Sequence, residues 1–125
     1  MKNELELLKQ FHNAFGHPVE TKPTFLSDDR LTLRIALIQE ELNEVEEAMM
    51  VNYHPDIMKE LSDLLVVTFG TIIECGYQDL IEQAFAEVMR SNMSKLGADG
   101  KPIYREDGKI LKGPDYKEAD MEQFF

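Results

Sequence analysis

The chain has 125 residues, of which 43% are hydrophobic and 30% are charged, and its formal net charge at pH 7 is −11. This length suits one domain of ordinary size. The negative charge argues against a nucleic-acid partner, because such binding depends on basic residues that neutralise phosphates. No apolar run is long enough to span a membrane, and the first residues do not resemble a signal peptide. We therefore expect a cytoplasmic protein that does not bind membranes.

Hydrophobic periodicity and turn residues predict four helices. They are expected at residues 3–15, 28–52, 55–75 and 78–96. Gly16 and Gly76 are suited to end the first and third helices. Ser27 or Asp28 can cap the second helix, and Pro55 suits the first position of the third. The predicted fold class is therefore all-α.

The second and third expected helices carry much of the apolar surface. On the second, apolar residues recur at alternating spacings of four and three, which predicts a stripe that faces the core. The members of this stripe are Leu31, Ile35, Ile38, Leu42, Val45 and Met49. Residues 64–73 are apolar around the whole circumference, and helical spacing on both sides favours a central buried helix over a buried strand. Four helices cover such a core thinly, so we expect a four-helix core bundle completed in a homodimer or homotetramer.

The end of the chain differs from the helical part. An Asp-Gly pair favours a tight turn, so residues 102–111 are predicted to form a short β-hairpin that turns at Asp107 and Gly108. An isolated hairpin is only marginally stable. We therefore expect a helical domain at residues 1–97 and a hairpin-like C-terminal tail at residues 98–125, packed on the bundle or on a neighbouring subunit.

Acidic residues on the second and third expected helices are spaced so that they converge. Glu40, Glu41 and Glu44 lie within one turn of each other, and Glu60 and Asp63 are three residues apart. Glu41 flanks the core stripe, and Asp63 leads into the apolar run, so Asp63 is expected to have little access to water. The short connection predicts that the two helices are antiparallel neighbours. The acids then form one cluster, with members Glu41, Glu44, Glu60 and Asp63.

A partly buried carboxylate must be protonated, paired with a cation or bound to a metal. Lys59 is the one basic residue at helical contact distance from Asp63, and it also competes for solvent, so a metal explains Asp63 better. Oxygen ligands without His or Cys favour Mg²⁺ or Mn²⁺, and Mg²⁺ usually also takes substrate phosphates. A di-iron bundle is disfavoured because no histidine lies three residues after a glutamate. An exposed acidic face is the alternative, and it explains Glu46 and Glu47 better than Asp63.

The pattern Glu-Glu-x-x-Glu at residues 40–44, followed by Glu-x-x-Asp at residues 60–63, resembles the all-α nucleoside triphosphate pyrophosphohydrolases. That superfamily includes MazG-like proteins, dimeric dUTPases and phosphoribosyl-ATP pyrophosphohydrolases. The resemblance covers roughly residues 28–96. The start and the tail look like short phage-type members, which would act in the host cytoplasm.

The resemblance implies roles for particular residues. The implied metal ligands are Glu41, Glu44, Glu60 and Asp63, which would hold about two or three Mg²⁺ ions, with Mn²⁺ as a substitute. Glu40, beside the catalytic Glu41, would bind a further metal or orient the attacking water. Family members often hold phosphates with Asn and Lys late in the last core helix, and the corresponding residues are Asn92 and Lys95. Arg105 and Lys112 would add positive charge from the tail.

The expected reaction is hydrolysis of a nucleoside triphosphate to the monophosphate and pyrophosphate. The first helix offers stacking and hydrogen bonding for the base and sugar through Phe11, His12, Asn13 and Phe15. The base and the choice of ribose or deoxyribose stay open, with dGTP as one example and phosphoribosyl-ATP or dUTP as alternatives. From another class, a non-catalytic acidic binding protein or DNA mimic would spread its acids over the surface.

Overall fold

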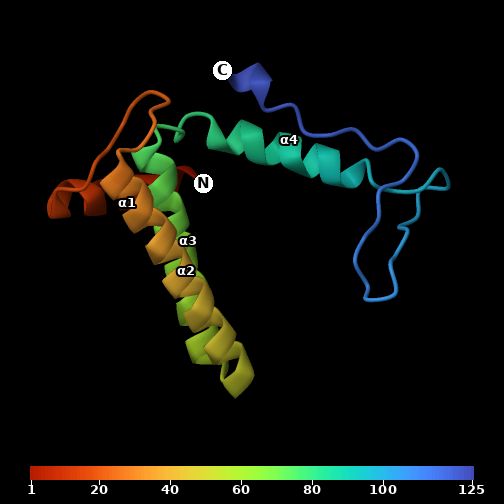
Figure 1. Ribbon diagram of the computed structural model, residues 1–125, viewed down its shortest axis with the longest axis horizontal. Helices are drawn as coiled ribbons and strands as arrows, with labels where there is room; N and C mark the ends of the chain where they lie inside the picture. Colours follow the sequence, from red (N-terminus) through yellow and green to blue (C-terminus); the bar gives the residue numbers. More distant parts are fainter. The chain divides into compact units, whose positions relative to one another are not determined.

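The computed structural model describes residues 1–125, which divide into two compact units, residues 1–79 and residues 80–125. The chain is all-α, as predicted, with four α-helices and no strand (Figure 1). The α-helices are α1 (Lys2–Phe15), α2 (Asp28–Val51), α3 (His54–Glu74) and α4 (Ile81–Met93), and a 3₁₀ turn covers Glu122–Phe124. None of the helices combines the length and hydrophobicity that a membrane span requires.

The ends of the helices follow the local signals in the sequence. The Ser27 hydroxyl accepts a hydrogen bond from the Arg30 backbone N–H at 3.3 Å, which satisfies one free donor at the start of α2. Gly16 ends α1 with a left-handed φ of 70°. The fourth helix is shorter than predicted, because the chain after Met93 continues in tighter turns, in which Lys95 N–H donates to Asn92 C=O at 3.1 Å.

In the first unit, α2 and α3 lie side by side along their length, and α1 packs on α3 (Figure 1). The turn at Asn52 and Tyr53 is short, so α2 and α3 run in opposite directions. The buried apolar side chains come from all three helices and are Leu5, Leu8, Val45, Ala48, Val67 and Ile73. The antiparallel pair of α2 and α3 forms a helical hairpin, and its short connection determines which residues of α2 lie beside which residues of α3.

The predicted core stripe of α2 is wrong in its orientation. Four of its six members are 46% to 59% exposed in the single chain, namely Leu31, Ile35, Leu42 and Met49. The buried residues of α2 are Arg34, Val45 and Ala48. The apolar surface of α2 is wider than the part that α3 covers, so packing selects one side of it. Glu41 lies on this same side of α2, four residues before Val45, and is half-buried.

The central helix is also less covered than predicted. Val67, Gly70 and Ile73 are buried, but Leu65 is 55% exposed and Val66 is 40% exposed. Within residues 1–79, α3 is covered by α1 and α2, which leaves its remaining side open. The apolar run is therefore buried on one face in the single chain. Completion of the core by a second subunit stays a prediction.

The second unit consists of α4 and the chain that follows it. The predicted hairpin is present as a turn with one antiparallel bridge between Tyr104 and Ile110, too short to count as a pair of strands. The tail runs back along α4 (Figure 1), where the Ser91 hydroxyl donates to the Lys117 carbonyl at 2.8 Å. Gly113 N–H donates to the Lys95 carbonyl, also at 2.8 Å. The expected domain boundary at residue 97 stays a prediction.

Candidate active site

The four acidic residues expected to cluster do lie together between α2 and α3. One carboxylate oxygen from each lies within 4.8 Å of the corresponding oxygens of the other three. Glu41 and Glu44 come from α2, and Glu60 and Asp63 come from α3. We refer to these four residues as the carboxylate cluster.

The helical hairpin explains why these residues meet. Each helix contributes a pair three residues apart, which puts both members of a pair on one side. Glu44 and Glu60 are equally far in sequence from Asn52, and so are Glu41 and Asp63. In an antiparallel hairpin that turns at Asn52, residues at equal distances from the turn lie at the same level. The short connection therefore aligns the two pairs.

The carboxylate cluster contains acidic groups that the protein itself does not satisfy. One oxygen of Glu41 and one of Glu60, the Oε2 atom in each, is buried without a hydrogen-bond partner. Such an atom loses its bonds to water and gains none in return. A hydrogen bond with Glu60, together with the negative charges of Glu41 and Glu60, raises the pKa of Glu44. Like charges at this distance disfavour full ionisation of the cluster.

Lys59 contributes a positive charge to the carboxylate cluster. Its Nζ lies 3.0 Å from Glu60 Oε1 and 2.9 Å from Asp63 Oδ2, while the side chain remains 63% exposed. These two acids raise the pKa of Lys59. Asp63 is 37% exposed, so the expectation that it has little access to water is wrong. The reason is its position on the first half of α3, before the buried part of the helix begins.

The donor set fits a hard divalent cation. Four carboxylates supply oxygen ligands of the kind that Mg²⁺ and Mn²⁺ prefer, and the two orphaned oxygens of Glu41 and Glu60 have no competing protein donor. A pocket beside the cluster gives access from solvent. It is lined by Glu44, Glu47, Ala48, Val51, Asp56, Lys59 and Glu60.

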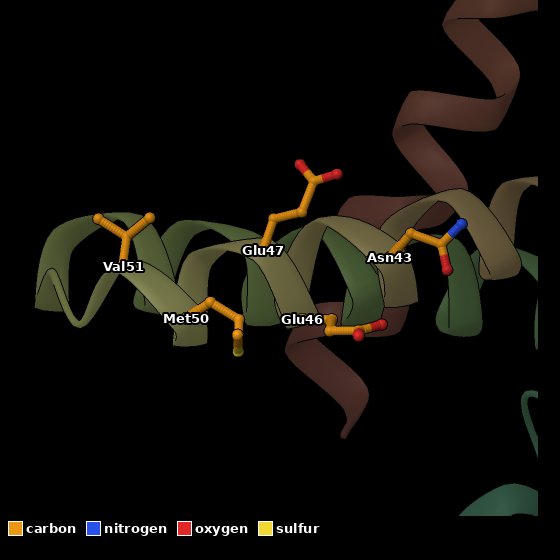
Figure 2. Close-up of a pocket in the computed structure, with 5 residues that line it drawn as sticks. All are labelled: Asn43, Glu46, Glu47, Met50 and Val51. Carbon is orange, nitrogen blue, oxygen red and sulfur yellow. The ribbon is translucent and has the colours of Figure 1, made fainter.

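Acidic residues of α2 outside the carboxylate cluster have other surroundings. Glu40 is exposed and does not belong to the group of four. Glu46 and Glu47 line another pocket on α2, together with Asn43, Met50 and Val51 (Figure 2). Both glutamates are exposed, as the sequence predicted for an ordinary acidic face. Glu46, which does not line the pocket beside the carboxylate cluster, is a natural control for charge changes on α2.

The residues predicted to contact base and sugar divide into two kinds. The rings of Phe11 and Phe15 lie 4.6 Å apart between centroids and are 45% and 67% exposed, and Asn13 is exposed. His12 is only 1% exposed, and its Nδ1 lies 3.0 Å from the Pro18 carbonyl oxygen. A carbonyl can only accept, so Nδ1 carries the hydrogen in the neutral ring. His12 thus has a structural contact that the sequence did not predict.

The predicted phosphate-binding residues all belong to residues 80–125. Asn92 is exposed on α4, and Lys95 is half-buried just after it. Arg105 is paired with Asp107 in the tail. The Nζ of Lys112 lies 4.8 Å from the centre of the Tyr116 ring, a cation–π contact. Their role toward phosphate stays a prediction.

A second charged group, which was not predicted from the sequence, is buried between α1, α2 and α3. Glu74 is fully buried, and its carboxylate accepts two hydrogen bonds from Arg30, at 2.7 and 2.8 Å. Arg34 Nη1 lies 3.1 Å from Glu74 Oε2, and His12 Nδ1 lies 4.0 Å from the same oxygen. We refer to these four residues as the Glu74 cluster. The available signal was a glutamate at the end of an apolar run, with no basic residue within four positions of it in the sequence.

The Glu74 cluster is satisfied by bonds within the protein. Arg34 also donates to the Val67 carbonyl at 2.6 Å and to the Thr71 hydroxyl at 3.0 Å. Burial lowers the pKa of Arg34, and the hydrogen bonds that Arg30 donates to Glu74 raise the pKa of Arg30. Burial also lowers the pKa of His12, in spite of the opposing effects of Pro18 and Glu74. This arrangement serves to hold three helices together.

Comparison with known proteins gives one family. The family model described as phosphoribosyl-ATP pyrophosphohydrolase matches residues 8–92, a range that includes both the carboxylate cluster and the Glu74 cluster. No curated protein matches the chain.

Proposed function

Because the chain belongs to the phosphoribosyl-ATP pyrophosphohydrolase family, and is therefore a hydrolase of phosphoric anhydrides, we propose that it is a Mg²⁺-dependent nucleoside triphosphate pyrophosphohydrolase. The observation that carries the metal dependence is the carboxylate cluster with its two orphaned buried oxygens. In the reaction, a water oxygen forms a bond to the α-phosphorus. The bond from that phosphorus to the bridging oxygen breaks, and the monophosphate and pyrophosphate are released.

The carboxylate cluster would hold about two or three divalent ions, with Mn²⁺ able to replace Mg²⁺. When bound, such ions polarise phosphoryl oxygens and lower the pKa of a coordinated water. Glu41, Glu44, Glu60 and Asp63 are the proposed ligands. Glu40, exposed on α2 next to Glu41, would bind a further ion or orient the attacking water, and the carboxylate of Glu40 or of Glu41 would accept one proton from that water.

The remaining substrate contacts are proposed from residue chemistry. The exposed rings of Phe11 and Phe15 suit stacking on a base, with Asn13 as a hydrogen-bonding group for base or sugar. His12 would act through the packing of this segment, since its ring is buried. The proposed phosphate-binding residues are Asn92, Lys95, Arg105 and Lys112.

Three nucleotides are candidate substrates. One is a purine deoxynucleoside triphosphate such as dGTP. Phosphoribosyl-ATP is the substrate named in the family's own description, and dUTP is a further candidate. All three present a phosphoric anhydride to the same four carboxylates.

We further propose that the active form is a homodimer or homotetramer. The support is the apolar surface that the first unit leaves open on α2 and α3, where Ile35, Leu42 and Leu65 are each about half exposed. A monomeric soluble protein rarely leaves contiguous apolar surface of this kind uncovered. Light scattering should give a mass of at least twice 14.4 kDa, and a mass equal to 14.4 kDa would contradict the proposal.

A substrate screen tests the proposed function. Pyrophosphate release would be measured for the eight common ribo- and deoxyribonucleoside triphosphates and for phosphoribosyl-ATP, with Mg²⁺ and with EDTA. We expect release from at least one of them that EDTA abolishes. Asp63→Asn should abolish this release, and Glu46→Gln, which changes an exposed acid outside the carboxylate cluster, should not. Undiminished release by Asp63→Asn would remove the metal site from the reaction.

A further inference from the structure

Lys59 contacts atoms that the proposed metal site also needs. Its ammonium group lies 3.0 Å from Glu60 Oε1 and 2.9 Å from Asp63 Oδ2, so it binds two of the four carboxylates, both on its own helix. The same side chain lines the pocket beside the cluster, together with Glu44 and Glu60. It is 63% exposed, so it can swing away into solvent without disturbing the core.

We propose that Lys59 is a counter-ion that competes with divalent cations for Glu60 and Asp63 and thereby sets the metal affinity of the site. This inference rests on the proposed metal-dependent function. A divalent cation held by the cluster would repel an ammonium only about 3 Å from the ligand oxygens, so Lys59 has to leave when the ion binds. The free energy of its two ion pairs is then subtracted from that of metal binding.

The consequence for function concerns the order of binding. A site with weakened affinity for the free ion favours an ion that arrives with a nucleotide, because phosphate oxygens supply additional ligands. The displaced ammonium stays at the edge of the same pocket, which otherwise is lined by the acids Glu44, Glu47, Asp56 and Glu60. There its positive charge can meet a phosphate, and no other basic side chain lines this pocket.

The location of the two ion pairs argues against an ordinary surface role for Lys59. An exposed lysine four residues before an aspartate commonly makes a weak pair on a helix, with little effect elsewhere. Here, however, both acids belong to the carboxylate cluster, and one of them, Glu60, has its second carboxylate oxygen buried without a partner. An ordinary surface pair would change stability equally with and without metal. A competing counter-ion stabilises the metal-free state and not the metal-bound state.

Metal binding by the full chain tests the inference. Binding of Mn²⁺ alone would be measured by isothermal titration calorimetry for the wild type, Lys59→Gln, Lys59→Arg and Lys9→Gln. Lys59→Gln should bind Mn²⁺ about three- to tenfold more tightly than the wild type, as expected for the loss of two exposed ion pairs. Lys59→Arg keeps the charge and should resemble the wild type. Lys9→Gln removes an exposed lysine of α1 and should also leave the affinity unchanged.

A second measurement records the melting temperature in EDTA and in saturating Mn²⁺. In EDTA, Lys59→Gln should melt below the wild type, because its acids have lost their counter-ion. In Mn²⁺ the difference should vanish or change sign. Equal or weaker Mn²⁺ binding by Lys59→Gln, or the same loss of melting temperature in both conditions, would overturn the role of Lys59 alone. Failure of the wild type to bind Mn²⁺ at all would instead contradict the proposed function.

Discussion

The carboxylate cluster and the Glu74 cluster both join α2 to α3, the Glu74 cluster with His12 of α1 as well, but they differ in how their acids are paired. In the Glu74 cluster one fully buried carboxylate faces two guanidinium groups, at 2.7 Å from Arg30 and 3.1 Å from Arg34. In the carboxylate cluster four acids share one exposed lysine, and two of their oxygens are buried without a partner. The first group has its cations built in. The second lacks positive charge and therefore has capacity for a metal.

The difference separates a structural role from a binding role. Substituting a buried acid that is fully paired strongly destabilises the fold, because its partners are left as unpaired buried charges. Acids that repel one another destabilise the metal-free protein, and a bound cation offsets this repulsion. Such acids are therefore expected at a site that binds a cation. Substitutions in the two clusters should therefore affect different quantities: stability for one, and activity for the other.

The largest expected effect is on stability, from Glu74→Gln. This change leaves Arg34 buried without its counter-charge and should lower the free energy of unfolding by about 3–5 kcal/mol. Glu47→Gln, at an exposed position of α2, should change it by less than about 0.5 kcal/mol. Urea titration followed by circular dichroism measures both. A loss below about 1 kcal/mol for Glu74→Gln would mean that the Glu74 cluster does not hold the helices together.

Glu41→Gln should instead lower the activity without lowering the stability. A lost metal ligand should remove several kcal/mol of transition-state stabilisation, which lowers kcat at least ~100-fold. In EDTA the same variant should be as stable as the wild type or more stable, because one of four mutually repelling charges is gone. Pyrophosphate release and urea titration are measured on the same preparation, with Glu46→Gln as the control. A variant that is both inactive and unstable would erase the contrast between the clusters.

The carboxylate cluster could be predicted from the sequence because local rules determine it. Spacing of three residues puts two acids on one side of a helix, and a short connection aligns Glu44 with Glu60 across the hairpin. The end of α1 and the start of α2 were equally predictable, since Gly16 and Ser27 act on their immediate neighbours. Predictions of this kind need no knowledge of how distant segments pack.

The Glu74 cluster could not be predicted because it depends on packing between distant segments. Arg30 and Glu74 are 44 residues apart, and nothing in either local sequence specifies their contact. The prediction of which side of α2 is buried was wrong for a related reason. Ile35 and Val45 both fit a helical apolar pattern, and only the position of α3 decides that Val45 is 6% exposed and Ile35 is 59% exposed. Sequence periodicity identifies apolar faces but does not say which part of a wide face finds a neighbour.

A smaller effect is expected from Gly70→Ala, which tests how tightly the Glu74 cluster is packed. A Cβ at Gly70 would lie 2.6 Å from Arg34 Nη2 and 2.8 Å from His12 Nε2, and both side chains are held by hydrogen bonds. Overpacking of about 1–3 kcal/mol outweighs a gain of up to about 1 kcal/mol in helix propensity, for a net loss near 1–2 kcal/mol. Ser62→Ala, exposed on the same helix, is the control in urea titration. A more stable Gly70→Ala variant would show that Arg34 and His12 can move freely.

The smallest expected effect is the pH dependence that His12 contributes. Burial lowers the pKa of His12 in the folded state below its ordinary value of 6.5. Between the folded-state pKa and pH 6.5, the unfolded state therefore binds a proton that the folded state does not. The free energy of unfolding therefore rises with pH in this window, by at most about 1.4 kcal/mol per pH unit. The contribution is complete above pH 6.5 and is lost as the pH falls from there toward the folded-state pKa.

The difference between the wild type and His12→Asn isolates this contribution, because every other titrating group is common to both proteins. Asparagine can still donate a hydrogen bond toward Pro18 but does not titrate, so its unfolding free energy should fall less steeply than that of the wild type below pH 6.5. Parallel curves for the wild type and His12→Asn would mean that His12 takes up its proton as readily when folded as when unfolded. The Glu74 cluster, in which one carboxylate faces two guanidinium groups, would then tolerate a third positive charge.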